Sequence, residues 1–489
     1  MNRYAASALK FFAYSVAALV ILLAVAVGLL RLMLPELPAY RDEIRARAGA
    51  AIGLDVEFDG IDARWRLSGP ELIFTDVTLT DPDSGDAVLA AEEVSVGGSI
   101  ARMLRERRVT VGRLALTGTS VTVERLPGGG FAVQGRAAGT SGDVPGGNLP
   151  GDIRIVLEDV DFTYRDPRAR GGPLEARLTS LEWSRSGGDQ ELEARLEPGS
   201  EIGRALRVLA ERQEGRDGPA TWDVNVEATD LDLGRVASIL PEDWPAPAAG
   251  MADVEIWSRF GAGGLRRAGA ALEVQGLQPA AAAAEVAPYD LSARLEWALN
   301  DGGWLAAVND LRIERGDTLR PDSFLQVSAE TGDGAALTAL EIQSGFLAMD
   351  DVRPFAAWLP AALAAPFADY DPSGELLSLR LSLDGLPAGV PFTYSLEAEL
   401  RDAGVAPHGG LPGVRGVSGS VRADESNGRL VLDAGTLVVD APEFFAAPIA
   451  FTRADATVVW RGIGSGLTVL CDRFILEDEW LATESSFEL

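Results

Sequence analysis

The sequence predicts a mostly β protein, in which an N-terminal transmembrane helix precedes a long, mainly antiparallel sheet accompanied by a few short helices. Apolar and polar residues alternate in about twenty segments, with the period of two that is typical of half-buried strands. The 54 glycines and 27 prolines fall mainly between these segments, where turns are expected. An uncharged run near the N-terminus has the length of a membrane span. Together these features favour one anchor followed by a large β region.

The predicted anchor begins with the uncharged apolar run at residues 11–30. As a helix rising about 1.5 Å per residue, this run would measure about 30 Å, the thickness of a bilayer's hydrocarbon core. Arg3 and Lys10 precede it and favour a cytoplasmic N-terminus. A cleaved signal peptide is the alternative, but the small-residue triplet Ala24-Val25-Ala26 lies inside the apolar run. We expect a cytoplasmic segment at 1–10 and a single transmembrane anchor at 11–34; in a Gram-negative cell, the inner membrane would then hold the remainder in the periplasm.

Charge and rare residues exclude several classes of function. The chain has 43 Lys and Arg against 73 Asp and Glu, a net charge of −30, so nucleic acid is excluded as a partner. There is one histidine, His408, and one cysteine, Cys471, which leaves few side chains for a Ser-His-Asp triad or a His/Cys metal site. The sequence therefore predicts no enzyme, no metal site and no cofactor. A glycosidase that relies on two carboxylates is the enzyme class that this argument leaves open.

An N-terminal β region is expected at residues 35–134, followed by a linker or long loop at 135–151 that is rich in glycine, serine and proline. One strand of this region changes its apolar face midway. Leu72 and Phe74 share one face, whereas Val77 and Leu79 share the other. A β-bulge near Thr75 would bring all four side chains to the same face.

Residues 152–489 are predicted to form a repetitive β region. Segments near 231–260 and 350–385 repeat one pattern: a short helix ending in Leu-Pro, a Pro/Ala loop, and a glycine followed by an alternating strand. A repeated unit favours an array over one compact globule. The chain ends directly after a strand pattern, with no capping element, and we expect it to be an N-terminal portion of a longer protein.

The clearest alternating strands define candidate residues for a functional apolar face. A sheet with one apolar face must bury it, either against a second sheet or against a ligand such as an acyl chain, and alternation alone does not separate the two. The candidate residues are Trp222, Val224, Val226, Leu377, Leu379, Leu381, Leu383, Phe392, Tyr394 and Leu396.

Three stretches together resemble one family. They are the anchor with residues 48–81, residues 114–135, and residues 411–462, which include the phrases Pro412-Gly413-Val414 and Gly428-Arg429-Leu430-Val431-Leu432-Asp433. They are similar to the AsmA-like family of Gram-negative bacteria and, within it, to the YhdP type. The resemblance implies an inner-membrane anchor, a long curled β-sheet with an elongated apolar groove, and movement of phospholipid towards the outer membrane.

The expected function is accordingly phospholipid transport and outer-membrane lipid homeostasis. Acyl chains would occupy the groove, and outer-membrane or periplasmic proteins would be the partners at its far end. The alternative is a periplasmic assembly factor that binds extended segments of outer-membrane proteins by strand addition.

Overall fold

A computed structural model describes most of the chain after the expected anchor. The described residues are 41–52, 54–66, 69–82, 85–99, 103, 110–127, 130–134, 136–137, 151–215, 219–242, 246–279, 287–300, 302–332, 337–358, 361–385, 393–462, 466, 468–480 and 482–488. The predicted anchor at 11–34 lies outside them, as does most of the predicted linker at 135–151. Within the described part, no helix has both the length and the apolar character of a membrane span.

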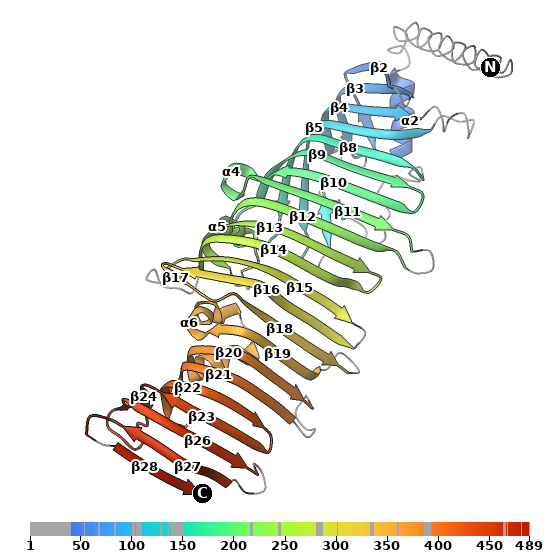
Figure 1. The fold of residues 1–489 in the computed structure, drawn as a ribbon. Helices are drawn as coiled ribbons and strands as arrows, with labels where there is room; N and C mark the ends of the chain where they lie inside the picture. The colour runs from blue at the N-terminus through green and yellow to red at the C-terminus, as the bar shows by residue number, and fades with distance from the viewer. Residues whose placement is uncertain are drawn as a thin grey trace, which may run out of the picture. The chain divides into compact units, whose positions relative to one another are not determined.

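The chain divides into two compact units (Figure 1). The first unit comprises Met1–Ser200 and Arg204–Gly218, and the second comprises Glu201–Gly203 and Pro219–Leu489. The first unit contains α2 (Arg41–Ile52), β1 (Asp55–Glu57), β2 (Gly60–Arg66), β3 (Gly69–Thr80), β4 (Ala87–Gly98), β5 (Val111–Arg125), β6 (Phe131–Val133), β7 (Arg136–Ala137), β8 (Ile153–Arg165), β9 (Leu174–Ser186), β10 (Asp189–Glu197) and β11 (Ala205–Gln213), with α4 (Gly199–Ile202) at the boundary.

The second unit begins with β12 (Thr221–Asp232), α5 (Leu233–Ile239), β13 (Pro247–Gly261), β14 (Gly264–Pro279), β15 (Tyr289–Asn300), β16 (Gly303–Arg315), β17 (Thr318–Leu319), β18 (Ser323–Thr331) and β19 (Leu337–Ala348). It continues with α6 (Met349–Val352), η3 (Arg353–Trp358), α7 (Ala361–Tyr370), β20 (Ser373–Asp384), β21 (Thr393–Val405), β22 (Gly413–Asp424), β23 (Asn427–Ala434), β24 (Leu437–Asp440), β25 (Ile449–Phe451), β26 (Arg453–Arg461), β27 (Thr468–Glu477) and β28 (Ala482–Glu488). We expected a Pro/Ala loop before β20. This prediction is wrong, because most of that segment forms the helix α7.

The prediction of a mostly β, mainly antiparallel protein with a few short helices is confirmed. Consecutive long strands pair with one another in antiparallel register, for example β12 with β13 and β20 with β21. Among the described strands, β5 and β8 form the one parallel pair, which β6 and β7 separate in the sequence.

In the first unit, strands change phase along one line across the sheet. Asp76 of β3, Gly118 of β5 and Asp159 of β8 have φ angles of 52°, 65° and 53°. The register places these three positions level with one another. A residue at positive φ interrupts the alternation, so that Phe74 and Val77 lie on the same face. The change of apolar face that the sequence shows near Thr75 thus occurs at Asp76, but the expected β-bulge is wrong, because β3 and β4 keep the same register on both sides of Asp76.

The second unit repeats this device. Asp230, Gly276, Asp310, Ser378 and Asp402 all have positive φ, and a register shift lies beside each in at least one strand pair. The apolar residues two before and one after each position lie on one face, as the pairs Ala228 with Leu231 and Val274 with Leu277 illustrate. We call these positions of both units the phase slips.

Side chains on the neighbouring strand satisfy the backbone amides at several slips. The Asp230 amide donates to Asp253 Oδ1 at 2.8 Å, and the Gly276 amide donates to Asp290 Oδ1 at 2.7 Å. An unpaired backbone N–H is costly, so these acceptors stabilise the interrupted ladder. The most deeply buried apolar side chains lie next to the slips. In the first unit, Val160 and Leu178 are 0% and 5% exposed, directly beyond them.

The polar face of the first unit encloses one buried carboxylate. Glu71 is 1% exposed, and its oxygens accept hydrogen bonds from Arg66 Nε at 2.6 Å, Arg113 Nη1 at 2.8 Å and Ser95 Oγ at 3.0 Å, and also from Arg64. Burial by itself raises the pKa of Glu71. The hydrogen bonds from Arg64, Arg66 and Ser95 outweigh burial and lower that pKa to about 2.

We expect Glu71 to make the first unit sensitive to acid. Its folded pKa lies below the unfolded value near 4.5, so its contribution is complete above pH 4.5 and disappears as the pH falls towards 2. A shift of this size corresponds to roughly 3 kcal/mol. Urea denaturation of wild type and Glu71→Gln across this pH range should give a steep loss of stability for wild type and a flat profile for the variant. Parallel profiles would contradict the assignment.

The slip at Ser378 gives a conformational test. Its φ is 51°, a region that a β-branched residue disfavours by about 1–2 kcal/mol. Ser378→Val should destabilise the second unit by this amount, whereas Ser378→Gly should not, because glycine adopts positive φ freely. Chemical denaturation followed by circular dichroism measures both. Equal stability of the two variants would show that the slip tolerates other backbone conformations.

Candidate functional site

An apolar face extends across the second unit in continuous cross-strand register. The residues of this face form rows that run across the strands. In what we call the first row, each residue lies directly opposite the next one on the neighbouring strand. From β12 to β22 the first row consists of Val224, Ser258, Ala268, Trp297, Ala306, Val327, Ile342, Leu381, Leu396 and Ala423. Such neighbours lie close enough to pack side by side, and successive strands are about 4.8 Å apart.

A second row runs parallel to the first and nearer to the phase slips. From β12 to β18 it contains Val226, Ile256, Ala270, Leu295, Val308 and Leu325. The two rows alternate with polar residues of the opposite face, as the strand period requires.

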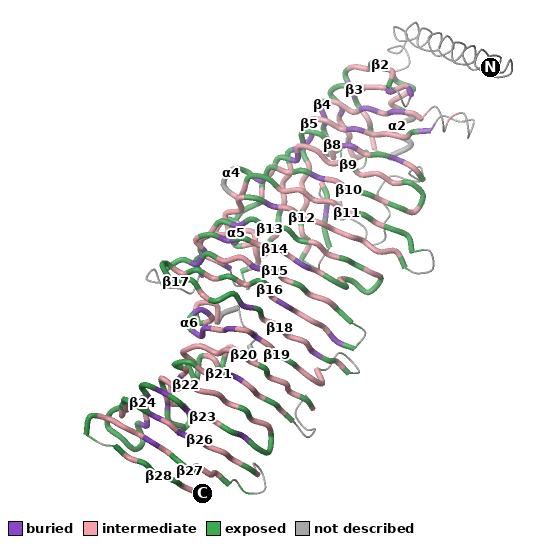
Figure 2. The backbone as a smooth tube through the Cα atoms, in the orientation of Figure 1, coloured by how far each residue is buried: buried purple, intermediate pink, exposed green. Residues whose placement is uncertain are grey.

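Much of this apolar face is accessible to solvent. Ile256, Phe260 and Leu299 belong to it and are 39%, 37% and 38% exposed. The fully buried residues are mostly small or lie beside the slips, and Figure 2 shows half-buried backbone along most strands of both units. A sandwich core would bury side chains of this size, so the face remains available to a ligand.

Eight of the ten candidate residues share this face. Trp222, Val224, Val226, Leu379, Leu381, Leu383, Tyr394 and Leu396 lie on it, according to the register of β12, β20 and β21. All eight are half-buried. Phe392 lies outside the described residues.

Leu377 is placed differently from its three neighbours on β20. The slip at Ser378 interrupts the alternation, and Leu377 lies opposite Glu399 of the polar face. Leu376 instead lies opposite Leu400, which shares the apolar face with Leu396. Serine at positive φ has no distinctive sequence signal, so the pattern of leucines at every second position concealed the interruption.

Several residues of the face were not among the candidates. Trp297, Trp304 and Trp460 all lie on it, by pairing with Ala306, Ala329 and Gly428. Trp297 belongs to a clean alternating strand and could have been included. Trp460 follows a run of two valines that hides the period of two.

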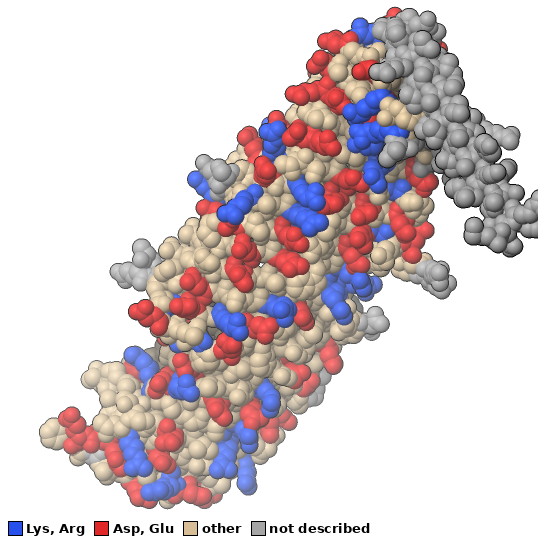
Figure 3. Space-filling view, turned by 45° about the horizontal axis from the view of Figure 1, so that its top comes forward, with Lys and Arg blue, Asp and Glu red and all other residues tan. Residues whose placement is uncertain are grey.

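The opposite face is polar and carries many cross-strand ion pairs. Arg259 Nε lies 2.6 Å from Asp223 Oδ1, and Arg422 Nε donates to Glu397 Oε1 at 2.8 Å. Figure 3 shows arginines and carboxylates interspersed over one side of the molecule. A hollow of about 620 Å³ on the polar face is lined by charged residues that include the ion pair Arg294–Asp310. Its lining combines these charged side chains with aliphatic residues such as Val254 and Leu272.

Helices cover the apolar face beyond the slips. Phe355 of η3 packs edge-on against the ring of Tyr289, with 5.5 Å between ring centroids, and Tyr289 is 1% exposed. Leu233 of α5 packs into the same cluster, together with Leu277. The apolar face is therefore closed on this side of the slips and accessible on the other. Figure 1 shows α5 and α6 at the strand ends opposite the turn that joins β13 to β14.

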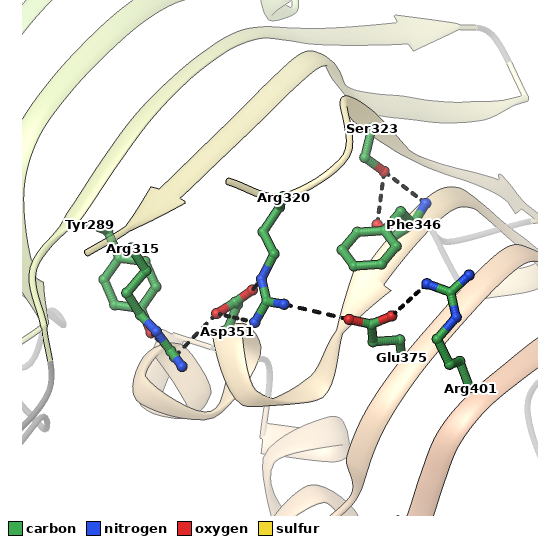
Figure 4. A network of polar contacts seen from close by, with 8 residues as sticks. All are labelled: Tyr289, Arg315, Arg320, Ser323, Phe346, Asp351, Glu375 and Arg401. Carbon is green, nitrogen blue, oxygen red and sulfur yellow. Dashed lines mark hydrogen bonds and ion pairs between the residues drawn. The ribbon is translucent and has the colours of Figure 1, made fainter. Parts of the chain in front are cut away.

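A network of ions fixes the segment that includes α6 and η3 (Figure 4). Asp351 of α6 is 7% exposed, and its carboxylate lies 2.7 Å from Arg320 Nε and 3.2 Å from Arg315 Nη1. Glu375 continues the network, because it lies 3.4 Å from Arg320 and 3.0 Å from Arg401. Arg315 also donates to the Tyr289 hydroxyl at 3.1 Å, which ties the network to the aromatic cluster.

No chemical centre is evident among the residues that the structure describes. Within them, no group of three or more His, Cys, Asp and Glu side chains is arranged to hold a metal ion. Cys471 is buried and contributes to an apolar cluster. The arrangement on which a function can be argued is thus the accessible apolar face, which can bind extended apolar groups.

The fold and this face define a class: repetitive antiparallel β proteins with an accessible apolar face. The chain belongs to the YhdP protein family, which it matches over residues 1–489. This match confirms the resemblance seen in the sequence.

Among curated proteins, the chain is similar to the intermembrane phospholipid transporter YhdP of Escherichia coli (strain K12), with 23% identity over 476 residues. The alignment covers 92% of this chain and 36% of that relative, so the chain spans about a third of the relative's length. No solved structure matches the chain.

The ion network should determine whether the helices stay in place. Asp351→Ala leaves Arg315 and Arg320 without their shared carboxylate, and we expect a loss of roughly 3 kcal/mol in the free energy of unfolding. The neighbouring Asp350→Ala is the matched control: Asp350 is 58% exposed and lies 3.9 Å from Arg353, so its removal should cost less than about 1 kcal/mol. Denaturation curves of both variants measure the difference. Equal effects would refute the anchoring role of Asp351.

Proposed function

We propose that this chain is part of an inner-membrane-anchored periplasmic protein that carries phospholipid towards the outer membrane and supports outer-membrane lipid homeostasis. The observation that carries the proposal is the registered apolar face, which is accessible to solvent in the second unit. The similarity to a relative named as an intermembrane phospholipid transporter supports the same assignment. The apolar run at 11–34 would supply the anchor.

The apolar face suits acyl chains on energetic grounds. Each methylene transferred from water to an apolar surface contributes about 0.8 kcal/mol. A phospholipid in the periplasm would otherwise expose its tails to water, so even partial cover lowers the cost of crossing. We further propose that the phase slips curl the sheet, so that the face lines a groove.

Repetition along the rows suits movement rather than storage. Each step from one strand to the next advances about 4.8 Å and meets a similar set of aliphatic side chains. A bound chain therefore meets mainly aliphatic side chains in these rows, and the hydroxyl of Ser258 in the first row donates to the Val224 carbonyl at 3.4 Å. Small residues such as Ala268 and Ala306 interrupt the larger ones and limit the affinity at each step.

Position 381 provides the experiment. A benzophenone amino acid in place of Leu381, in the full chain produced in Gram-negative cells fed radioactive phosphate, should form phospholipid adducts on irradiation. The control is the same substitution at Ser382, the next residue, whose side chain faces the polar side. Adducts at 381 that greatly exceed those at 382 support the proposal. Equal labelling, or labelling at neither position, would overturn it.

A further inference from the structure

Aromatic side chains of the apolar face collect near the ends of strands, although not all at one level, because the register places Trp460 in line with Leu396 of the first row, two residues further in than Tyr394. Trp222, Phe260, Trp304, Tyr394 and Trp460 each occupy the second residue from a strand end. In each case that end adjoins a turn on the side away from α5 and α6, and the side chain lies on the apolar face. We call these five residues the aromatic rail.

The rail contrasts with the rows behind it. The second row, nearer to the slips, contains only aliphatic residues between β12 and β18: Val226, Ile256, Ala270, Leu295, Val308 and Leu325. The first row contains one aromatic residue from β12 to β22, Trp297. Chemical character therefore changes across the strands, from a mixture of aromatic and aliphatic residues at the turns, where Leu299 and Leu383 lie opposite Trp304 and Tyr394, to aliphatic residues towards the slips.

The rings of the rail are held at the surface rather than buried. Phe260 is 37% exposed and the other four are half-buried. At Trp460 the residue on the opposite strand, Gly428, explains how the ring is placed. A Cβ at Gly428 would lie only 1.8 Å from the indole Cζ2, so glycine is needed for the ring to lie flat against the sheet.

The depth behind the rail matches one layer of acyl chains. Six residues separate Trp222 from Ala228, the last apolar position before the slip at Asp230. At about 3.3 Å per residue this distance is about 20 Å. The hydrocarbon of one leaflet is about 15 Å thick, half of a bilayer core. A phospholipid can therefore lie across the strands with its tails wholly on the aliphatic part.

We propose that the aromatic rail positions the glycerol–ester region of a bound phospholipid, with the headgroup at the turns and the tails directed to the slips. This inference rests on the proposed function and adds the orientation of the lipid. Tryptophan and tyrosine favour the boundary between hydrocarbon and water, because their rings are largely apolar but carry one polar group. The opposite orientation is disfavoured, because η3 and α5 cover the apolar face beyond the slips.

Two positions on one strand test the orientation. Benzophenone amino acids at Trp304 and at Val308, on the same face of β16 and about 13 Å apart, are introduced separately into the full chain in Gram-negative cells. After irradiation, fragmentation mass spectrometry locates the attachment point within each lipid. We expect attachment at glycerol or the first chain carbons from 304, and at the distal half of the chain from 308.

The outcomes separate the rail from the function on which it rests. Adducts at both positions with the same or the reverse depth order would overturn the rail and leave phospholipid binding intact. Absence of adducts at 304, 308 and 381 would overturn both. As a second readout, Trp304→Leu should broaden the attachment points obtained from 308. Trp257→Leu, which removes a tryptophan opposite Asn225 on the polar face, should leave them unchanged. An unchanged pattern in Trp304→Leu would also refute the rail.

Discussion

The phase slip is the constraint on which the rest of this structure depends. Side chains in a strand alternate strictly between the two faces of the sheet. A long strand in which the apolar pattern changes phase would therefore place part of its apolar residues on the polar face. One residue at positive φ resets the alternation at that point. Because the slips of neighbouring strands stand level, as at Asp76, Gly118 and Asp159, one apolar face continues on both sides of the line.

An accessible apolar face is a liability that this chain counters on its other surfaces. Exposed apolar patches promote association between molecules. Here the opposite face carries cross-strand ion pairs such as Arg259–Asp223, and the net charge of −30 opposes contact between copies. Buried ions such as Asp351 and Glu71 contribute differently, since each fixes a local arrangement through several arginines. Charge and apolarity are therefore segregated by face, so that the charged face opposes association between copies while the apolar face stays open.

The alternation predicted which face most residues occupy, because that property is local. Val224, Leu381 and Leu396 were selected from three separate strands, and the register places them in one row. The slip at Asp76 was also foreseeable, from a change of apolar face within one strand, and aspartate is among the residues that tolerate positive φ. The slip at Ser378 gave no such signal. The network around Asp351 could not be predicted from the sequence either. Its arginines lie 31 and 36 positions away in sequence, and only the pairing of strands brings them together.

In the binding mode that we propose, the rows and the rail constrain a phospholipid in two perpendicular directions, and the difference between them matters for the proposed transport. Along a row, successive strands offer nearly the same aliphatic surface, so the free energy of a bound chain changes little with each step. Across the strands the surface changes from partly aromatic to aliphatic, so the free energy depends strongly on depth and orientation. A ligand held under these conditions keeps its orientation while its position along the sheet remains free. That combination follows from strand period and register alone, and it needs neither a specific polar contact nor a moving part of the protein.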